Sequence, residues 1–367
     1  MLANCTALPN LGRLRRANRC YILSSIVFTW HSKEILKSRT TTFKDSTVRL
    51  VFIIDPIQNL DPTHDTSVAI MEAAQALGHQ VWVTQANLLS VVAGKAWALL
   101  ERVQLKPVQL GEGRWVAEAD WYQLSDRTFR PLEDMDAVFM RTDPPVSSSY
   151  LYATYILDCI DSSKTLVINS PQGLRAANEK MYALQFPKVI PETIVSADKQ
   201  VIRQFMESKG AAILKPLGNK AGEGILYLEP GDRNFNSIVE LSTLQGRMPV
   251  MVQTYLPAAK EGDKRIILLN GKPIGALNRL STGSEFRNNM AAGGTVAKTE
   301  ITEQEQIICT EIAETLRKNG LFFVGIDVIG GYLTEINVTS PTGIREIDRL
   351  EGTRLGEQVI QGMVFNS

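Results

Sequence analysis

The sequence predicts an α/β fold that opens with a domain of parallel strands and helices. Two observations support this prediction. Apolar runs at residues 49–54 and 81–84 flank a helical pattern at 67–77, which is the strand–helix–strand order of a parallel sheet. In the second half of the chain, strand-like runs come in pairs around glycine-containing turns, which is typical of antiparallel hairpins.

The first domain is predicted to continue with a strand at 137–141, a helix at 150–160 and a strand at 166–169, while the polar stretch 107–134 forms loops and short hairpins. Ligands of open α/β sheets usually bind beyond the carboxyl ends of the strands. Asp55, Arg141 and Asp143 fall at such ends. Each is a candidate binding residue, and the alternative for each is a loop residue that satisfies neighbouring backbone groups.

Composition places the chain among globular proteins. Its 367 residues are 44% hydrophobic and 21% charged, which is enough material for two or three domains. The formal net charge is zero, so the totals do not indicate a nucleic-acid partner. Cys5, Cys20, Cys159 and Cys309 are scattered and form no C-x-x-C motif, so we expect free thiols in a reducing cytoplasm rather than a disulfide framework.

Residues 1–47 differ from the rest of the chain, with eight lysines and arginines against two acidic residues. Arginines precede an apolar run at 21–30, as in a signal peptide, but no small-residue cleavage pattern follows and the run is too short to span a bilayer. An organellar transit peptide is a second interpretation. The third, which we favour, is that the true start lies near Val48 and that residues 1–47 are an artefact of the gene model and not part of the mature protein.

The second half of the chain is predicted to contain a helix at 174–186, strands at 211–217, 225–229 and 250–256, a hairpin of 265–269 with 273–280, and a helix at 302–319. Asn270-Gly271 gives the strongest short hairpin signal in the chain. The loop 218–224 has the form of a flap whose N–H groups fold over phosphates, although most such loops are plain connections. The glycine-rich loop 281–295 is expected to be either a functional lid or a disordered insertion.

Near the C-terminus, two β-rich runs joined by a glycine pair form a candidate metal site. Glu335 and Asn337 are two residues apart on one strand and share a face, while Ile336 and Val338 face a core. Asp327 lies on the partner strand. Two carboxylates and an amide oxygen suit Mg²⁺, and the lack of nearby His or Cys in the sequence argues against zinc. The alternative is the solvated face of an amphipathic hairpin.

The turn decides whether these three side chains meet. A strict two-residue turn at Gly330-Gly331 pairs Asp327 with Thr334 and sends Asp327 and Glu335 to opposite faces. An odd loop centred on Gly331, with glycine in the left-handed conformation of a bulge, pairs Asp327 with Glu335 instead. The metal site therefore predicts the odd loop.

Basic side chains add a second kind of chemistry. Lysine neutralises phosphate as a point charge, whereas the planar fork of arginine suits a carboxylate or an acyl phosphate. Together with the flap and the oxygen ligands, the basic side chains predict a site for a nucleoside triphosphate and an anionic second substrate. Such a set is sufficient because phosphoryl transfer needs little beyond positioning and charge neutralisation. Taken singly, each is also compatible with a solvated surface position. These residues are Lys180, Lys215, Arg265, Arg279, Arg287 and Arg345.

Several motifs occur in a fixed order between about residues 49 and 345. They are Asn178-Glu179-Lys180, the stretches 213–217, 253–257, 262–265, 291–294 and 333–342, and, upstream, Met140-Arg141 with Asp143-Pro144-Pro145 and the stretch 152–157. In this order the chain resembles the prokaryotic-type glutathione synthetase family of ATP-grasp ligases. The flap departs from the family pattern, because residues 218–222 are poorer in glycine and include a lysine.

The resemblance implies an ATP-grasp fold of two α+β subdomains, preceded by the open α/β N-terminal domain. It implies ATP-dependent ligation of γ-glutamylcysteine to glycine through an acyl phosphate, giving glutathione, ADP and phosphate, with Mg²⁺ as cofactor and Mn²⁺ as an alternative. The corresponding division is an extension at 1–47, an N-terminal domain at 48–171, a central subdomain with the flap at 172–256, and a C-terminal subdomain with the metal site and lid at 257–367.

The resemblance also implies roles for individual residues. ATP contacts are expected from Lys180, Lys215, Gln253, Tyr255, Leu256 and Asp263, and metal ligation from Asp327, Glu335 and Asn337. Arg265, Arg279 and Arg287 are the expected catalytic residues, which hold the peptide and the transferred phosphoryl group. Substrate carboxylates are expected at Arg141, Ser340, Thr342 and Arg345.

Two other functions stay open at this point. One is another carboxylate–amine ligase of the same fold, and the other is a regulatory ATP-binding protein without turnover, against which the intact set of Asp327, Glu335 and Arg265 argues. The resemblance further implies a cytoplasmic homo-oligomer, a tetramer, held by an exposed apolar surface on the first domain. We expect small-molecule substrates and neither a nucleic-acid nor a membrane partner.

Overall fold

The computed structural model of the chain describes residues 47–218, 222–280 and 295–363. The basic extension, most of the predicted lid with Arg287, and three residues of the flap therefore lie outside the described residues. Within the described ranges, no helix is long and apolar enough to cross a membrane.

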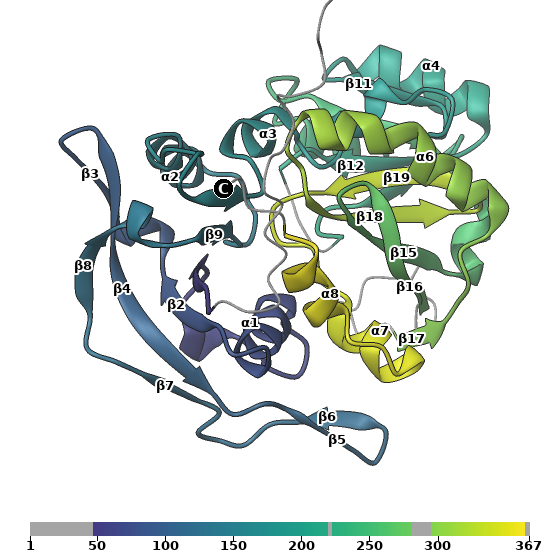
Figure 1. Ribbon diagram of the computed structural model, residues 1–367. Helices are drawn as coiled ribbons and strands as arrows, with labels where there is room; N and C mark the ends of the chain where they lie inside the picture. The colour runs from purple at the N-terminus through teal and green to yellow at the C-terminus, as the bar shows by residue number, and fades with distance from the viewer. Residues whose placement is uncertain (1–46, 219–221, 281–294, 364–367) are drawn as a thin grey trace, which may run out of the picture. The chain divides into compact units, whose positions relative to one another are not determined.

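The N-terminal domain is built on an eight-stranded sheet in which the main strand order is β10-β9-β1-β2-β4-β3. Strands β10, β9, β1 and β2 are parallel neighbours, which confirms the predicted open α/β domain (Figure 1). Their bounds are β1 Arg49–Ile53, β2 Gln80–Thr84, β9 Ala137–Met140 and β10 Leu166–Ile168, with helices α1 Thr66–Ala76 and α2 Ser148–Leu157 between them. These elements match the predicted ones to within a few residues.

The sequence predicts no element between residues 85 and 106, and here the structure differs. Strands β3 Leu89–Val92 and β4 Lys95–Leu105 form a hairpin that extends the sheet with antiparallel pairing. Its two-residue turn places Ala93 and Gly94 at positive φ. Alanine rarely occupies such a position and also has a low strand propensity, so the local sequence gives no hairpin signal.

Shorter strands complete the N-terminal domain in the stretch predicted to hold loops and hairpins. Strands β7 Tyr122–Leu124 and β8 Thr128–Pro131 pair with β4, and β5 Gln109–Gly111 pairs with β6 Arg114–Val116 as a separate two-stranded arm.

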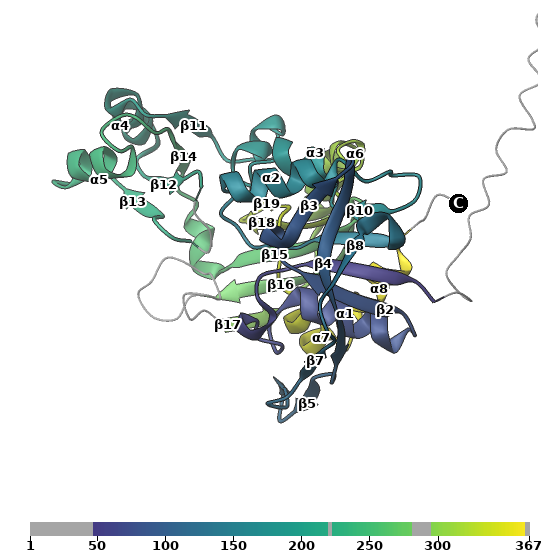
Figure 2. The same ribbon diagram turned by 90° about the vertical axis from the view of Figure 1, so that its left-hand side faces the viewer.

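The middle of the chain forms a four-stranded antiparallel sheet in the order β11-β14-β12-β13. The strands are β11 Thr193–Ser196, β12 Ala212–Pro216, β13 Leu226–Leu228 and β14 Val250–Thr254, and the helices are α4 Lys199–Lys209 and α5 Phe235–Ser242. Figure 2 shows both helices on one side of this sheet, where Ile202, Met206, Phe235 and Val239 join its inner face in a separate small core. The sheet thereby forms a unit with its own interior.

The C-terminal sheet has five antiparallel strands in the order β17-β16-β15-β18-β19, with helix α6 packed beside it. The bounds are β15 Asp263–Leu269, β16 Lys272–Leu280, β17 Thr295–Lys298, α6 Glu303–Lys318, β18 Phe323–Ile329 and β19 Tyr332–Asn337. The predicted hairpin about Asn270-Gly271 is confirmed, because Leu269 pairs with Lys272 and both turn residues have positive φ.

The prediction of one continuous helix at 174–186 is wrong. Helix α3 covers only Pro171–Ala176, and a 3₁₀ helix covers Met181–Gln185. The side-chain oxygen of Asn178 accepts hydrogen bonds from the backbone N–H groups of Lys180 and Met181, which replaces helical bonding with a local turn. The break frees the carbonyl of Glu179 to accept a hydrogen bond from Ile336 in β19.

The last two helices pack against the first domain. Helices α7 Ile344–Glu351 and α8 Leu355–Gln361 lie beside α1 (Figure 1), and α7 also contacts strands β16 and β17 of the C-terminal sheet. Their buried side chains belong to the same hydrophobic cluster as those of β1, β2 and α1, and these include Ile344, Ile347, Leu355, Val359 and Ile360. The core of the N-terminal domain is therefore completed by the C-terminus of the chain.

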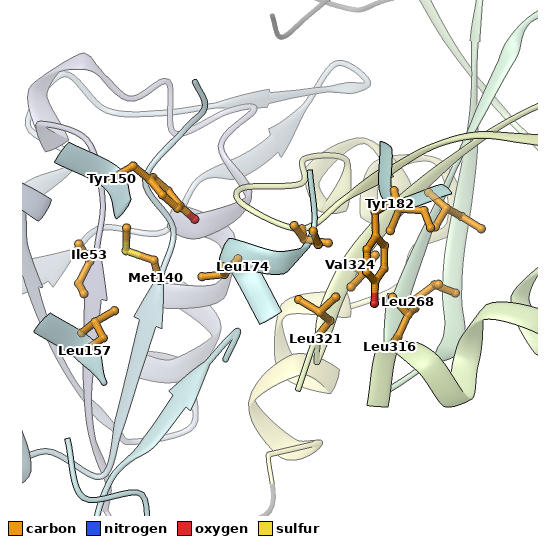
Figure 3. Packing of buried hydrophobic residues seen from close by; sticks show 14 of the residues in the cluster. Ile53, Met140, Tyr150, Leu157, Leu174, Tyr182, Leu268, Leu316, Leu321 and Val324 are labelled. Atoms are coloured by element: carbon orange, nitrogen blue, oxygen red, sulfur yellow. The ribbon is translucent and has the colours of Figure 1, made fainter. Parts of the chain in front are cut away.

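A second hydrophobic cluster continues through both halves of the chain. Figure 3 shows Ile53, Met140 and Leu157 on one side of Leu174, and Leu321 and Val324 on the other. Helix α3 carries Leu174 and lies between the two halves. The hydrophobic core is therefore continuous across this short helix.

We expect the two described cysteines to differ sharply in reactivity. Cys309 on α6 is 1% exposed, and burial, with a contribution from Glu305, raises the pKa of its thiol to about 12, whereas Cys159 is partly exposed. Iodoacetamide at pH 8 should therefore label Cys159 in the native protein and leave Cys309 unmodified, as read by peptide mass spectrometry. Labelling in urea supplies the control, and equal rates of modification in the native state would contradict the burial argument.

Candidate active site

The hairpin of β18 and β19 brings the predicted metal ligands together, but not through the predicted turn. Asp327 pairs with Glu335, as the metal site requires. The connection is nevertheless a two-residue turn, since Ile329 pairs with Tyr332 and both glycines have positive φ. The prediction of an odd loop is therefore wrong.

The extra residue lies further along the strand. The register shifts between Asp327 and Val328, because Val328 pairs with Leu333 and Asp327 with Glu335, which leaves Thr334 as the additional residue of a β-bulge. The Thr334 hydroxyl donates to the carbonyl oxygen of Asp327 at 3.1 Å, which holds the bulge in place. A glycine pair suits a two-residue turn. No local sequence pattern marked the bulge, so it was not predicted.

The Asp327 carboxylate lies in a cage of cationic side chains. Arg265 donates through Nε to Oδ1 at 2.5 Å and through Nη2 to Oδ2 at 3.0 Å. Arg279 approaches Oδ2 at 3.0 Å, and the Asn337 amide donates to the same oxygen at 3.3 Å. Burial would raise the pKa of Asp327, but the two arginines outweigh it and hold this pKa well below the ordinary value.

Arg279 also binds a second carboxylate. Its Nη2 donates to Oδ2 of Asp263 at 2.5 Å, at the first residue of β15. Burial raises the pKa of Asp263 to about 6, with Arg279 opposing the rise and Asp327 adding to it. Asp263 and Asp327 therefore both contact Arg279, and because Arg265 also pairs with Asp327, two carboxylates are balanced by two guanidinium groups.

Both predicted lysines are buried at the same place. Lys180 lies 3.5 Å from Oε1 of Glu335. Burial lowers the pKa of Lys215. The negative charge of Glu335 opposes this lowering, and the positive charge of Lys180 adds to it. Two buried ammonium groups close together are unfavourable on their own and suit a polyanion such as a triphosphate.

A pocket joins these charged groups to an apolar wall. The lining residues come from β12, β14, the segment after β14, β15, β16, β18 and β19, and those predicted from the sequence are Lys215, Gln253, Tyr255, Leu256, Asp263, Arg279, Asp327 and Glu335. Gln253 is 3% exposed and donates to the Thr193 hydroxyl at 3.0 Å, and the ring of Tyr255 meets that of Tyr227 edge to face. Amide and aromatic side chains beside apolar ones have the chemistry to bind a planar base, and the lysines have the chemistry to bind phosphates.

The apolar part of the pocket was missed by the sequence analysis. Pro191, Ile213, Ile225 and Ile329 line it, and from sequence alone an apolar strand residue that faces a ligand looks the same as one that faces a core. Gly222 of the flap also lines the pocket, while residues 219–221 lie outside the described ranges.

Glu179 is a further residue whose role the sequence did not reveal. Its Oε1 accepts hydrogen bonds from the backbone N–H groups of Val338 and Thr339 and, at 2.8 Å, from the Thr339 hydroxyl. Burial raises the pKa of this carboxyl. Glu179 therefore fixes the loop that leaves β19, immediately beside Lys180.

The predicted substrate residues lie on that loop and at its contact with the first domain. Arg141 donates through Nη2 to the Pro341 carbonyl at 2.9 Å, and Arg265 donates through Nη1 to the Thr342 carbonyl at 3.2 Å. Ser340 and Thr342 are partly exposed between these contacts.

One other acid near a strand end, Asp55, plays a local part. The Asp55 carboxylate accepts a hydrogen bond from the backbone N–H of Asp143, which agrees with the alternative of a loop residue that satisfies the backbone.

The side chain of Arg345 points to the N-terminal domain instead of the pocket. Its Nε donates to the Pro62 carbonyl at 3.0 Å, Nη2 lies 2.8 Å from Glu72, and the guanidinium lies over the Trp115 ring. These contacts tie α7 to the first domain, so the Arg345 side chain holds the loop between β19 and α7 in place and does not line the pocket.

The predicted metal ligands have the right chemistry but are arranged around cations of the protein. Asp327, Glu335 and Asn337 offer carboxylate and amide oxygens on paired strands, which suits a hard divalent ion. Among the described residues no group of three or more His, Cys, Asp or Glu side chains forms a metal cluster by itself. The set therefore fits Mg²⁺ only with further ligands from water and substrate phosphates.

Solved structures identify the class to which this fold belongs. The chain resembles the RimK-domain ATP-grasp protein of Sphaerobacter thermophilus, with a TM-score of 0.55 and 16% identity over 86% of this chain and 99% of that one. It resembles the D-cycloserine synthetase DcsG with a TM-score of 0.57 and 13% identity over 85% and 98%. At these identities the likeness shows the fold, which is an ATP-grasp fold.

Sequence relatives define the particular family. The model of the prokaryotic glutathione synthetase N-terminal domain matches residues 48–175, and that of the prokaryotic glutathione synthetase ATP-grasp domain matches 179–352. A glutathione synthetase of a Nostoc species is 76% identical over 87% of this chain and 98% of its own length, and that of Thermosynechococcus vestitus is 64% identical over 85% and 98%. The chain belongs to the prokaryotic glutathione synthetase family and is an ATP-dependent ligase.

Removing the negative charge of Asp327 should destabilise the fold more than removing that of Glu335. Asp327→Asn leaves Arg265 and Arg279 buried without their shared carboxylate, and breaking a buried ion pair costs about 3–5 kcal/mol. Glu335→Gln loses a single partly exposed contact and should cost less than about 1 kcal/mol. Urea unfolding of both variants measures the difference, and equal losses would show that the arginine cage does not depend on Asp327.

Proposed function

We propose that this chain joins γ-glutamylcysteine to glycine at the described pocket, with ATP converted to ADP and phosphate. The observation that supports this most directly is a single pocket lined by an apolar wall, a buried lysine and the Asp263–Arg279–Asp327 cluster, in a chain of this family. The apolar wall suits the adenine, and the charged end suits the phosphates and the reacting carboxylate.

In this proposal the nucleotide is held by residues of three strands, of the segment after β14, and of the segment between α3 and the 3₁₀ helix. Gln253, Tyr255 and Leu256 bind the base, Lys180 and Lys215 neutralise the phosphates, and Asp263 faces them from β15. Asp327, Glu335 and Asn337 would hold Mg²⁺, or Mn²⁺ as the alternative, which when bound neutralises the terminal phosphates.

The peptide half of the reaction falls to the arginines and to the loop after β19. The cysteinyl carboxylate attacks the γ-phosphoryl group, and an acyl phosphate forms. The glycine amine then displaces phosphate through a tetrahedral intermediate. Arg265 and Arg279 stabilise the developing negative charge, and Arg287 remains a proposed third member. Ser340, Thr342 and Arg141 bind the substrates, and Arg345 positions their loop.

Assembly and location belong to the same proposal. Apolar side chains are exposed on β3, β8 and α2 of the first domain, namely Val91, Val92, Phe129, Tyr152 and Tyr155. We propose that this surface joins copies of the chain into a homo-oligomer, a tetramer by the family resemblance. The domain division at 48–171, 172–256 and 257–367 is supported by the three larger sheets, and the two described free cysteines agree with a cytoplasmic location.

The activity itself is tested by phosphate release. With Mg-ATP present, we expect release that requires γ-glutamylcysteine and glycine together, with glutathione as product by mass spectrometry. Turnover with other carboxylate and amine pairs, but not with this one, would establish another ligase of the fold. Nucleotide binding without ADP formation under any pairing would establish the regulatory alternative.

Glu335→Gln should leave the fold intact and abolish most ATP turnover. The amide keeps the size of the side chain but loses the charge that faces Lys180 and that would bind the divalent ion. We expect kcat to fall by at least about 100-fold, measured by coupled ADP release, with an unchanged circular dichroism spectrum. Glu314→Gln on the exposed face of α6 is the matched control. Retention of more than a tenth of the activity would remove Glu335 from the proposed ligand set.

A further inference from the structure

The motif Asn178-Glu179-Lys180 is connected by hydrogen bonds and an ion pair to both sheets that line the pocket. It lies in the short segment that separates α3 from the 3₁₀ helix. One wall of the pocket comes from β12 and β14 of the central sheet, and the other from β15, β16, β18 and β19 of the C-terminal sheet. Three consecutive side chains of this segment each contact a different part of the site.

The Asn178 side chain is joined to the central sheet. Its Nδ2 donates to the carbonyl oxygen of Leu217 at 3.1 Å, directly after β12 and two residues past Lys215. Its Oδ1 accepts from the backbone N–H groups of Lys180 and Met181 at 3.2 and 3.0 Å, which holds the amide in one orientation. Asn178 therefore sets the separation between the end of β12, which carries Lys215, and the segment that carries Lys180.

The Glu179 side chain is joined to the C-terminal sheet instead. Its Oε1 accepts from the backbone N–H groups of Val338 and Thr339 at 3.2 and 3.3 Å, and from the Thr339 hydroxyl at 2.8 Å. Its backbone carbonyl accepts an N–H group of β19. Val338 and Thr339 are buried and begin the loop to α7 that carries Ser340 and Thr342.

The length of the Glu179 side chain determines where this loop begins. Three donors converge on one carboxylate oxygen, and hydrogen bonds to a charged acceptor are shorter and stronger than neutral ones. Neither Asn178 nor Glu179 is among the described residues that line the pocket. Both side chains therefore act on the site through other residues.

We propose that Asn178 and Glu179 are positioning residues for different substrates. Asn178 acts on ATP, through the end of β12 and Lys215, whereas Glu179 acts on the dipeptide, through the loop after β19. This inference rests on the proposed function. The motif thereby holds the nucleotide half and the peptide half of the site at a fixed separation, which matters because a displacement of about 1 Å between reacting groups can cost about 100-fold in rate.

The Asn178 contact predicts an effect on ATP alone. In Asn178→Ser the hydroxyl can still cap the turn but is too short to reach Leu217. We expect KM for ATP to rise about fivefold, the equivalent of one ordinary hydrogen bond, while KM for γ-glutamylcysteine changes by less than about twofold. Asn236→Ser is the matched control, because this exposed asparagine joins α5 to Arg203 of α4 and does not line the pocket, so every KM should be unchanged.

Two substitutions of Glu179 separate reach from charge. Glu179→Asp keeps the charge and shortens the side chain, whereas Glu179→Gln keeps its length and an accepting oxygen. We expect Glu179→Asp to lower kcat/KM for γ-glutamylcysteine at least about tenfold with KM for ATP within about twofold of wild type, and Glu179→Gln to retain kcat/KM within about threefold. A glutamine variant as impaired as the aspartate variant would show that charge matters instead of reach, and would overturn the positioning role.

A merely structural role predicts a different pattern. General loosening of the segment would raise KM for ATP and for the dipeptide together in each variant, and that outcome would overturn the inference. If wild type releases no phosphate with γ-glutamylcysteine and glycine, the proposed function fails, but calorimetric titration with Mg-ADP still tests the Asn178 contact. Its Kd should rise about fivefold in Asn178→Ser and stay unchanged in Glu179→Asp, and an unchanged Kd in Asn178→Ser would overturn the inference.

Discussion

The ion-pair cage around Asp327 is the interaction on which the arrangement of the site depends. Its carboxylate orders Arg265 and Arg279, and each arginine then fixes something else. Arg265 holds the Thr342 carbonyl of the substrate loop, and Arg279 holds Asp263 at the start of β15. The bulge at Thr334 aligns Asp327 with Glu335, so one additional residue in β19 connects the backbone register to the electrostatics of the whole pocket.

Buried lysines lie beside the acids of this pocket. Lys180 and Lys215 are buried near each other, and burial, with a contribution from the charge of Lys180, lowers the pKa of Lys215. Such a cluster is costly without an anion and favourable with one, which is the usual form of a preorganised phosphate site. The acids of the pocket limit this cost, since Glu335 faces Lys180 and Asp263 and Asp327 offset Arg279.

Sequence alone predicted the parallel strands of the first domain and the Asn270-Gly271 hairpin, because each has a strong local signal. The pairing of Asp327 with Glu335 was predicted only from the needs of a metal site and through the wrong turn, since the bulge at Thr334 that produces it has no local signal. The β3–β4 hairpin gave none, since its turn uses Ala93 at positive φ. The break after α3 depends on the Asn178 side chain, which also donates to the carbonyl of Leu217 at the base of the flap. Contacts such as those of Arg345 with Pro62 and Glu72 join residues more than 270 positions apart, and no local pattern encodes them.

The packing of α7 and α8 on α1 governs the order in which the chain can fold during synthesis. The first domain leaves the ribosome early, yet part of its hydrophobic core is supplied by residues 344–363. Domains at the N-terminus ordinarily fold first, but here the apolar surface of α1 stays uncovered until the last helices emerge. The nascent first domain therefore presents aggregation-prone surface throughout translation, and folding chaperones that shield such surface would favour its correct assembly.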